Sequence, residues 1–193
     1  HRLERMAPHK VAALGIARTF QNVALFKGMS ALDNILMGRH VHMRPSALAS
    51  LFYWVWAKDE EVRNREKVEE IIDLLQLQSV RHEPVETIPL GMQKRVELAR
   101  ALAAEPRLLI LDEPMAGMNQ EEKEYMVRFI LDACEALNLS VLLIEHHLDV
   151  VTAICRRVAV LNHGVKIAED AAADAMRDPE VVAAYIGQVE HDG

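Results

Sequence analysis

The sequence predicts an α/β fold built around a parallel sheet. Two short runs, RLLIL at residues 107–111 and SVLLIE at residues 140–145, are apolar almost throughout and do not alternate with polar residues. Such runs are typical of strands that helices cover on both faces of a parallel sheet. Segments with helical character lie before and between the two runs, so strands and helices alternate in this half of the chain.

Composition is that of a globular protein. The chain has 193 residues, enough for one compact domain or two small lobes, and its 51% of hydrophobic residues can form a sizeable core. A formal net charge of -7 disfavours nucleic acid as a partner. Cys134 and Cys155 are expected to be reduced thiols. No apolar run reaches the roughly 18–20 residues that span a bilayer.

The first strand is expected to be short. Residues 1–10 show no clear element, residues 11–14 suggest a helical turn, and residues 16–20 favour a strand with Gln21 at its end. A glutamine in this position is either an ordinary loop residue or a functional one.

Two helices are expected next. Ser30 fits an N-cap, with Asp33 three residues later, and Pro45 ends the helix that follows. The apolar side of that helix consists of Leu32, Ile35 and Leu36. A long charged helix follows at residues 58–78, with a solvated charged face. Its buried stripe is expected to contain Val62, Val68, Ile71, Ile72, Leu74, Leu75 and Leu77.

The window between these helices, residues 47–57, is the most apolar in the chain. It holds four of the nine aromatic residues: Phe52, Tyr53, Trp54 and Trp56. The window is either a helix packed in the core of a helical lobe or an exposed aromatic patch that docks a partner protein.

A glycine marks the start of the next helix, expected over Met92–Ala104. Free backbone N–H groups and the helix dipole make such a start an anion-binding site, and Gly91 lets a phosphate come close. The helix should bury Val96, Ala99, Leu102 and Ala103. The charged residues expected to face outward or onto neighbouring loops are Lys94, Arg95, Glu97 and Arg100.

Two acids, Asp112 and Glu113, follow the first apolar run, and Pro114 ends the strand. Ligands of open α/β sheets bind at the carboxyl ends of strands. Two carboxylates in that place can hold a magnesium ion and activate a water molecule. Taken alone, an Asp-Glu pair at a strand end belongs to a surface turn about as often as it belongs to a functional site.

These segments together resemble the ATPase subunits of ABC transporters, and in particular those of branched-chain amino acid importers. The matching stretches are GIARTFQN, QKRVELARAL, LLILDEP and the glutamate-histidine pair after the second apolar run. The resemblance implies ATP and Mg²⁺ as ligands, with Asp112 and Gln21 near the metal ion. It implies that Glu113 polarises the attacking water and that His146 contacts the terminal phosphate.

The signature segment departs from the family pattern. The L-S-G-G-Q signature corresponds to residues 88–92, which include Pro89, Leu90, Gly91 and Met92. The family has serine where this chain has Pro89, and glutamine where it has Met92. We expect a weaker phosphate clamp that depends on Gly91 and on the first amides of the helix.

The D-loop corresponds to residues 116–119, AGMN, and includes Gly117 and Asn119. Asn119 replaces the aspartate usual in ABC ATPases, so a polar contact that it makes across a dimer carries no charge. A helix is expected over Gln120–Leu137, with Tyr125, Phe129, Ile130 and Leu137 on its apolar side.

Two histidines, His146 and His147, follow the second apolar run. Because neighbouring parallel strands bring their carboxyl ends to one edge of the sheet, His146 is expected near Glu113. His147 stands where the family usually has aspartate. Adjacent side chains on an extended backbone point in opposite directions, so we expect only His146 to face the site.

The remaining elements are a strand at residues 157–161, a turn at 162–164, a returning strand at 165–168 and a helix at 171–177 before Pro179. Residues 180–187 resemble the terminus of the branched-chain subfamily. The resemblance thus implies a partial RecA-like P-loop NTPase core with an inserted α-helical subdomain. Residues 1–22 would close the first part of the core, 23–105 form the helical subdomain, and 106–193 form the second part.

The phosphate-binding pattern G-x-x-x-x-G-K-[ST] does not occur in the sequence. The chain is then either an N-terminally truncated piece of an active ATPase or a natural short form without hydrolysis. The start at His1 instead of Met favours truncation. This polypeptide alone is expected to bind ATP weakly or not at all.

The function that the resemblance implies is the ATP-hydrolysing subunit of a branched-chain-amino-acid-type importer. Its partners would be transmembrane permease subunits and a second ATPase subunit, in a homo- or heterodimer at the inner face of the cell membrane. One alternative is a non-catalytic regulatory or interaction module of the same fold. A soluble ABC ATPase of DNA repair or translation is disfavoured by the subfamily match around Gln21 and by the acidic composition.

Overall fold

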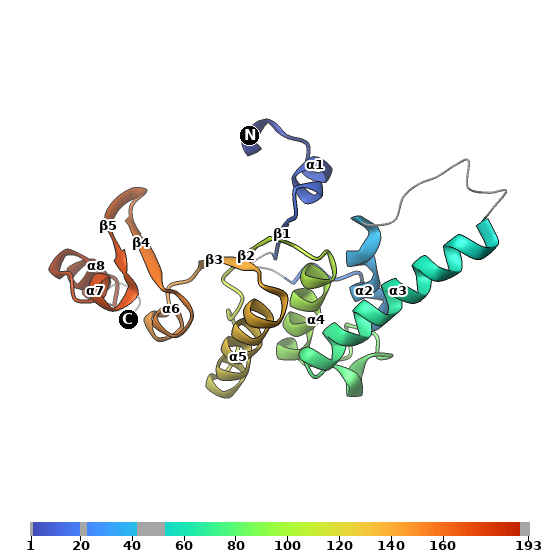
Figure 1. Cartoon of the computed structure of the whole chain (residues 1–193). Coiled ribbons are helices and arrows are strands. Elements are labelled where there is room, and N and C mark those ends of the chain that lie inside the picture. Colours follow the sequence, from blue (N-terminus) through green and yellow to red (C-terminus); the bar gives the residue numbers. More distant parts are fainter. Residues whose placement is uncertain (1, 20–22, 42–52, 190–193) are drawn as a thin grey trace. The chain divides into compact units, whose positions relative to one another are not determined.

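The computed structural model describes residues 2–19, 23–41 and 53–189 (Figure 1). The chain divides into two compact units, residues 1–144 and 145–193. The sequence-based division into three segments stays a prediction. Among the described residues, none of the helices is both long and apolar enough to cross a membrane.

A three-stranded parallel sheet forms the centre of the first unit. Its strands are β1 (Ile16–Arg18), β2 (Leu108–Asp112) and β3 (Ser140–Ile144), in the order β1-β2-β3. The pairing of β2 with β3 runs from Leu108 opposite Ser140 to Asp112 opposite Ile144. The parallel sheet and both apolar strands are therefore confirmed, and the two strands end at the same level.

We expected both faces of these two strands to be buried, and that prediction is wrong for β3. In β2, Leu109 and Leu111 are buried, while Leu108, Ile110 and Asp112 are half-buried. In β3, Leu142 is 53% exposed and Ile144 is nearly as exposed. Alternate side chains of a strand point to opposite faces, and the exposed set of β3 shares one of them.

The helices of the first unit mostly follow the expected boundaries. Ser30 caps α2, because its Oγ accepts the N–H of Asp33 at 3.1 Å. Three helices were placed less well: α1 begins before residue 11, α2 ends at Gly38 and not at Pro45, and α3 runs from Tyr53 to Leu74 instead of over residues 58–78. The helices are η1 (Leu3–Arg5), α1 (Pro8–Ala13), α2 (Ala31–Gly38), η2 (Arg39–Val41), α3 (Tyr53–Leu74), η4 (Gln78–Val80), α4 (Leu90–Ala103) and α5 (Gln120–Leu137).

The helices α2, α3 and α4 share a core. A Cβ added to Gly38 of α2 would lie 2.2 Å from the carbonyl oxygen of Arg100, so only glycine permits this approach to α4. The buried guanidinium of Arg39 donates to Asn64 Oδ1 of α3 and to the carbonyl oxygen of Ala103, both at 2.9 Å. Fully buried apolar residues in these helices are Ala31, Ile35, Val68, Ile72, Val96, Ala99, Leu102 and Ala103.

Several side chains lie on faces other than those expected. Lys94 and Glu97 were expected to face outward or onto loops, but they are only 6% and 4% exposed. Conversely, Val62 of α3 and both Tyr125 and Leu137 of α5 are exposed. The buried face of α5 instead consists of Met126, Phe129, Ile130 and Ala133.

The described residues of the second unit, 145–189, form a β-hairpin and three helices. Its elements are α6 (Leu148–Ile154), β4 (Arg157–Asn162), β5 (Val165–Ala171), α7 (Ala172–Ala175) and α8 (Pro179–Val189). The antiparallel pairing of β4 with β5 confirms the predicted hairpin. Its two-residue loop, His163 and Gly164, has positive φ at both positions (47° and 80°), which is the backbone of a type I′ turn.

Two predictions fall largely outside the described residues. Gln21 lies outside them, and so does most of the aromatic window at residues 47–57. Tyr53 begins α3, but the side chains of the window are not described.

Candidate functional site

The site begins where β2 ends. Asp112 is the last residue of the strand, and the backbone N–H of Glu113 donates to the carbonyl oxygen of Ile144 on β3 at 2.9 Å. Glu113 has a φ of 46°, in the left-handed region that non-glycine residues seldom occupy. Such a conformation costs on the order of 1 kcal/mol and is typical of functional turns. The chain therefore turns sharply at Glu113, at the carboxyl edge of the sheet.

Arg18, the last residue of β1, contacts the first of the two acids. Its Nη2 donates to Oδ2 of Asp112 at 2.6 Å. The side chain of Arg18 is about half exposed, whereas that of Asp112 is mostly buried. The guanidinium thus compensates the aspartate charge from the solvent side.

Oxygen donors suit a magnesium ion, and Asp112 and Glu113 supply carboxylates at this edge. Arg18 engages Oδ2 of Asp112, and Oδ1 is the oxygen that a cation would use. The donor set therefore fits Mg²⁺. The other predicted ligand, Gln21, lies outside the described residues.

The segment after the acids is fixed by the start of α5. The side chain of Asn119 accepts the N–H of Glu122 at 2.9 Å, and Glu122 Oε2 accepts the N–H of Asn119 at 3.0 Å. This reciprocal pair is a capping box, which satisfies two backbone donors at the helix start. Within the D-loop, Gly117 has a φ of 77°, a conformation that favours glycine.

The start of α4 lies against this segment. A Cβ atom added to Gly117 of the D-loop would lie 3.1 Å from Cδ2 of Leu90. A Cβ atom added to Gly91 would lie 2.4 Å from Oε1 of Glu122. Pro89 is the N-cap residue of α4, and no side chain caps this helix start. The signature and the D-loop are thus in contact.

Arg95 lies one turn further along α4 and links it to α5. Its guanidinium stands 5.3 Å from the ring centroid of Phe129. Burial lowers the pKa of Arg95, while the negative charge of Glu122 acts in the opposite direction. The packing of both helix starts therefore includes a partly desolvated cation.

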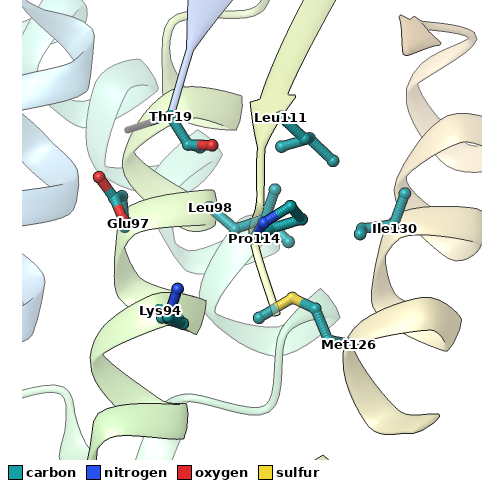
Figure 2. A pocket seen from close by; sticks show the side chains of 8 residues that line it. All are labelled: Thr19, Lys94, Glu97, Leu98, Leu111, Pro114, Met126 and Ile130. Atoms are coloured by element: carbon teal, nitrogen blue, oxygen red, sulfur yellow. The ribbon is translucent and has the colours of Figure 1, made fainter. Parts of the chain in front are cut away.

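A small cavity lies behind the acids, between α4 and α5 (Figure 2). Apolar side chains form most of its lining, which consists of Leu98, Leu111, Pro114, Met126 and Ile130 together with Thr19, Lys94 and Glu97. The hydroxyl oxygen of Thr19 is buried without a hydrogen-bond partner among the described residues. Because the lining is mainly apolar and the volume small, this cavity is part of the packing, not a substrate site.

The switch segment is Glu145, His146 and His147, at the start of the second unit. The carboxylate of Glu145 folds back on the chain: Oε2 accepts the N–H of His146 at 3.1 Å and lies 3.0 Å from Nδ1 of His147. The two imidazole rings are neighbours, with centroids 4.2 Å apart. The expectation that only one histidine side chain lies on a given side is therefore wrong, because the backbone has left the strand at Ile144.

The structure brings most of the predicted site residues together. Within the first unit, the acids at the end of β2 lead directly into the D-loop, and the D-loop contacts the signature segment. His146 belongs to the other unit, so its proximity to Glu113 stays a prediction. Sequence reasoning missed Arg18 and Glu122. The spacing of Glu122 three residues after Asn119 is the capping-box pattern and could have revealed it.

Comparison with known proteins identifies the class of this site. The family model described as ABC transporter matches residues 3–116, more than half of the chain. The chain therefore belongs to the ABC transporter family, and its fold is that of an ABC ATPase.

Individual relatives agree with this assignment. The chain is 34% identical over 186 residues to the high-affinity branched-chain amino acid transport ATP-binding protein BraF of Pseudomonas aeruginosa, covering 96% of this chain and 73% of BraF. It is 33% identical to the probable branched-chain amino acid transport ATP-binding protein LivG of Archaeoglobus fulgidus, covering 93% of this chain and 68% of LivG. The ADP conformation of MJ1267, an ATP-binding cassette of an ABC transporter, superposes with a TM-score of 0.75 at 33% identity, covering 94% of this chain and 72% of MJ1267.

Proposed function

We propose that this chain is the ATP-hydrolysing subunit of an importer for branched-chain amino acids. The observation that carries the proposal is the contact among three segments of the first unit: the acids at the end of β2, the D-loop, and the start of α4 that no side chain caps. An ABC ATPase needs carboxylates for the metal ion and the water, and a helix start for phosphate.

The residue roles follow from chemistry and position. Asp112, together with Gln21, would hold Mg²⁺, which supplies charge compensation for the phosphates when bound. Glu113 orients the attacking water and accepts its proton, because a carboxylate at the strand end can reach a nucleotide bound at that edge. His146 donates a hydrogen bond to the terminal phosphate.

The start of α4 serves a nucleotide held mainly by a second ATPase subunit. Pro89 makes no side-chain cap at this start, so the helix dipole and the first amides of α4 would be available to phosphate, with Gly91 itself buried against Glu122. Gly117 and Asn119 of the D-loop would contact the same partner. In this arrangement, two subunits enclose two nucleotides head to tail.

The substrate class rests on the relatives and on one sequence segment. BraF and LivG are named as branched-chain amino acid transport proteins, and the stretch GIARTFQN resembles that subfamily. The subunit would lie at the inner face of the membrane and act on transmembrane permease subunits.

A non-catalytic module is the second candidate. Pro89, Met92 and Asn119 replace polar or charged residues of the family pattern, which favours weakened nucleotide chemistry. The retained pair Asp112 and Glu113 favours hydrolysis, and an activity measurement separates the two candidates.

The test is Glu113→Gln in an assembled transporter whose ATPase subunit carries this chain together with the phosphate-binding pattern G-x-x-x-x-G-K-[ST]. We expect ATP turnover to fall about 10²–10⁴-fold while MgATP binding is retained, because the amide cannot accept a proton. Glu121→Gln, an exposed residue in the first turn of α5, removes the same charge nearby and should leave turnover unchanged. Equal turnover in parent and Glu113→Gln proteins would remove Glu113 from the mechanism, and no turnover in a parent that carries the phosphate-binding pattern would support the non-catalytic module.

A further inference from the structure

Three consecutive residues of the second unit, Glu145, His146 and His147, present a carboxylate and two imidazoles to one point. One ligand atom from each residue lies within 4.8 Å of the others. Imidazole nitrogen combined with carboxylate oxygen is the ligand set of many zinc sites, whereas Mg²⁺ and Ca²⁺ prefer oxygen donors alone. The chemistry of this cluster therefore differs from that of the two acids after β2.

Two of the three separations between ligand atoms are near those of a tetrahedral ion. Two ligands of tetrahedral zinc lie about 3.3 Å apart, because each is roughly 2.0–2.1 Å from the metal. Glu145 Oε2 is 3.0 Å from Nδ1 of His147 and 3.9 Å from Nδ1 of His146, on either side of this value. The ligand atoms of all three residues lie within 4.8 Å of one another, so a bound ion would require the imidazoles to rotate closer together.

The carboxylate is held in place before any metal arrives. The N–H of His146 donates to Oε2 at 3.1 Å, which fixes the folded-back side chain of Glu145. That side chain is fully buried, and its other oxygen, Oε1, has no hydrogen-bond partner among the described residues. A buried carboxylate oxygen without a partner is costly, and a nearby cation would offset that cost.

Access is open on the imidazole side. The side chains of His146 and His147 are 60% and 30% exposed, so a hydrated ion can approach and keep a water molecule as its fourth ligand. We propose that Glu145, His146 and His147 form a binding site for Zn²⁺ or a similar late transition-metal ion, and that the bound ion inhibits ATP hydrolysis. The inhibitory part rests on the proposed function, because His146 cannot bind the metal and the terminal phosphate through the same nitrogen.

The first experiment needs no nucleotide. The metal-free chain is titrated with Zn²⁺ and, separately, with Mg²⁺ by isothermal titration calorimetry. We expect a Zn²⁺ site whose affinity falls at least about tenfold in His147→Ala and in Glu145→Gln, since even residues that only support a ligand contribute that much. Circular dichroism of each variant checks that the fold is retained.

The matched control is His163→Asn. This exposed histidine lies in the hairpin turn of the same unit at a φ of 47°, which asparagine also adopts. Its substitution removes one imidazole and should leave Zn²⁺ affinity unchanged. Equal Zn²⁺ affinity in the parent, His147→Ala and Glu145→Gln proteins, or Mg²⁺ binding at the same site with the same affinity, would overturn the proposal.

The second experiment addresses inhibition separately. In the assembled transporter with MgATP, saturating Zn²⁺ should lower turnover of the parent and of His163→Asn, and have less effect on His147→Ala. If Zn²⁺ binds as expected but leaves turnover unchanged, the inhibitory role is wrong and the site stands. If the parent shows no turnover without Zn²⁺, the proposed function fails, while the binding titration still decides on the site.

Discussion

The starts of α4 and α5 lie against each other but are built differently. Asn119 and Glu122 cap α5 with two reciprocal hydrogen bonds, so the helix satisfies its own first donors. At α4 the N-cap residue is Pro89, which makes no side-chain hydrogen bond to the first amides. Gly91, in the first turn of α4, touches the Glu122 side chain that completes the cap of α5.

This difference separates a structural helix start from one suited to a ligand. Backbone donors that a side chain already satisfies cannot bind phosphate, whereas Pro89 offers no such acceptor to the first donors of α4. At the start of α5, the side chain of Glu122 instead packs against Gly91. Four substitutions test this division, and they are ordered by the expected change in the free energy of unfolding, measured by urea denaturation.

The largest change is expected for Gly91→Val. Its Cβ would lie 2.4 Å from Oε1 and 2.9 Å from Cδ of Glu122, so the capping box must open or the helices must separate. We expect a loss of about 1–3 kcal/mol, as for other overpacked sites. In the Glu122→Ala background the same substitution should cost clearly less. An equal cost in both backgrounds would contradict the contact.

Asn119→Ala should cost about 1 kcal/mol, because it removes the side-chain oxygen that accepts the N–H of Glu122. Asn119→Asp keeps that oxygen and adds a negative charge at the helix start, where the dipole favours it. Its stability should match the parent protein or exceed it slightly. If alanine and aspartate have the same effect, the cap does not stabilise α5.

Glu122→Ala removes only the return bond to the N–H of Asn119. This amide lies near the surface, where water can replace the carboxylate, so we expect a loss of roughly 0.5 kcal/mol. Glu122→Gln retains an acceptor oxygen and serves as the control. A loss larger than that of Asn119→Ala would show that Glu122 contributes mainly through its contact with Gly91.

Pro89→Ser should change stability least. A serine hydroxyl can cap α4, which stabilises by about 0.5–1 kcal/mol, but loss of proline frees the unfolded chain and costs about 0.4–1 kcal/mol. The two terms nearly cancel. A gain above about 1 kcal/mol would mean that the uncapped start of α4 is strained, not simply open.

Periodicity and cap chemistry predicted much of the fold. The apolar runs became β2 and β3, Ser30 caps α2, and α5 spans the expected residues. Burial was harder to predict, because it depends on which neighbours cover a face. The buried carboxylate of Glu97 accepts the N–H of Ala24, and no local pattern encodes that contact because the two residues are 73 positions apart.

The candidate site shows the same limit. Asp112, Glu113 and the signature segment were recognisable from their order along the chain. The ion pair of Arg18 with Asp112 joins residues of two strands far apart in sequence and required the sheet register. The pairing of His146 with His147 depends on where the backbone leaves β3, which side-chain alternation alone does not predict.

The central claim is that the start of α4 meets a nucleotide phosphate. It is tested by the labelling rate of Met92→Cys with a maleimide in the assembled transporter, after Cys134 and Cys155 are replaced by serine. The account predicts that MgATP slows labelling in proportion to the fraction of sites filled, while a cysteine replacing exposed Leu131 of α5 reacts at an unchanged rate. Equal labelling of Met92→Cys with and without saturating MgATP would contradict it.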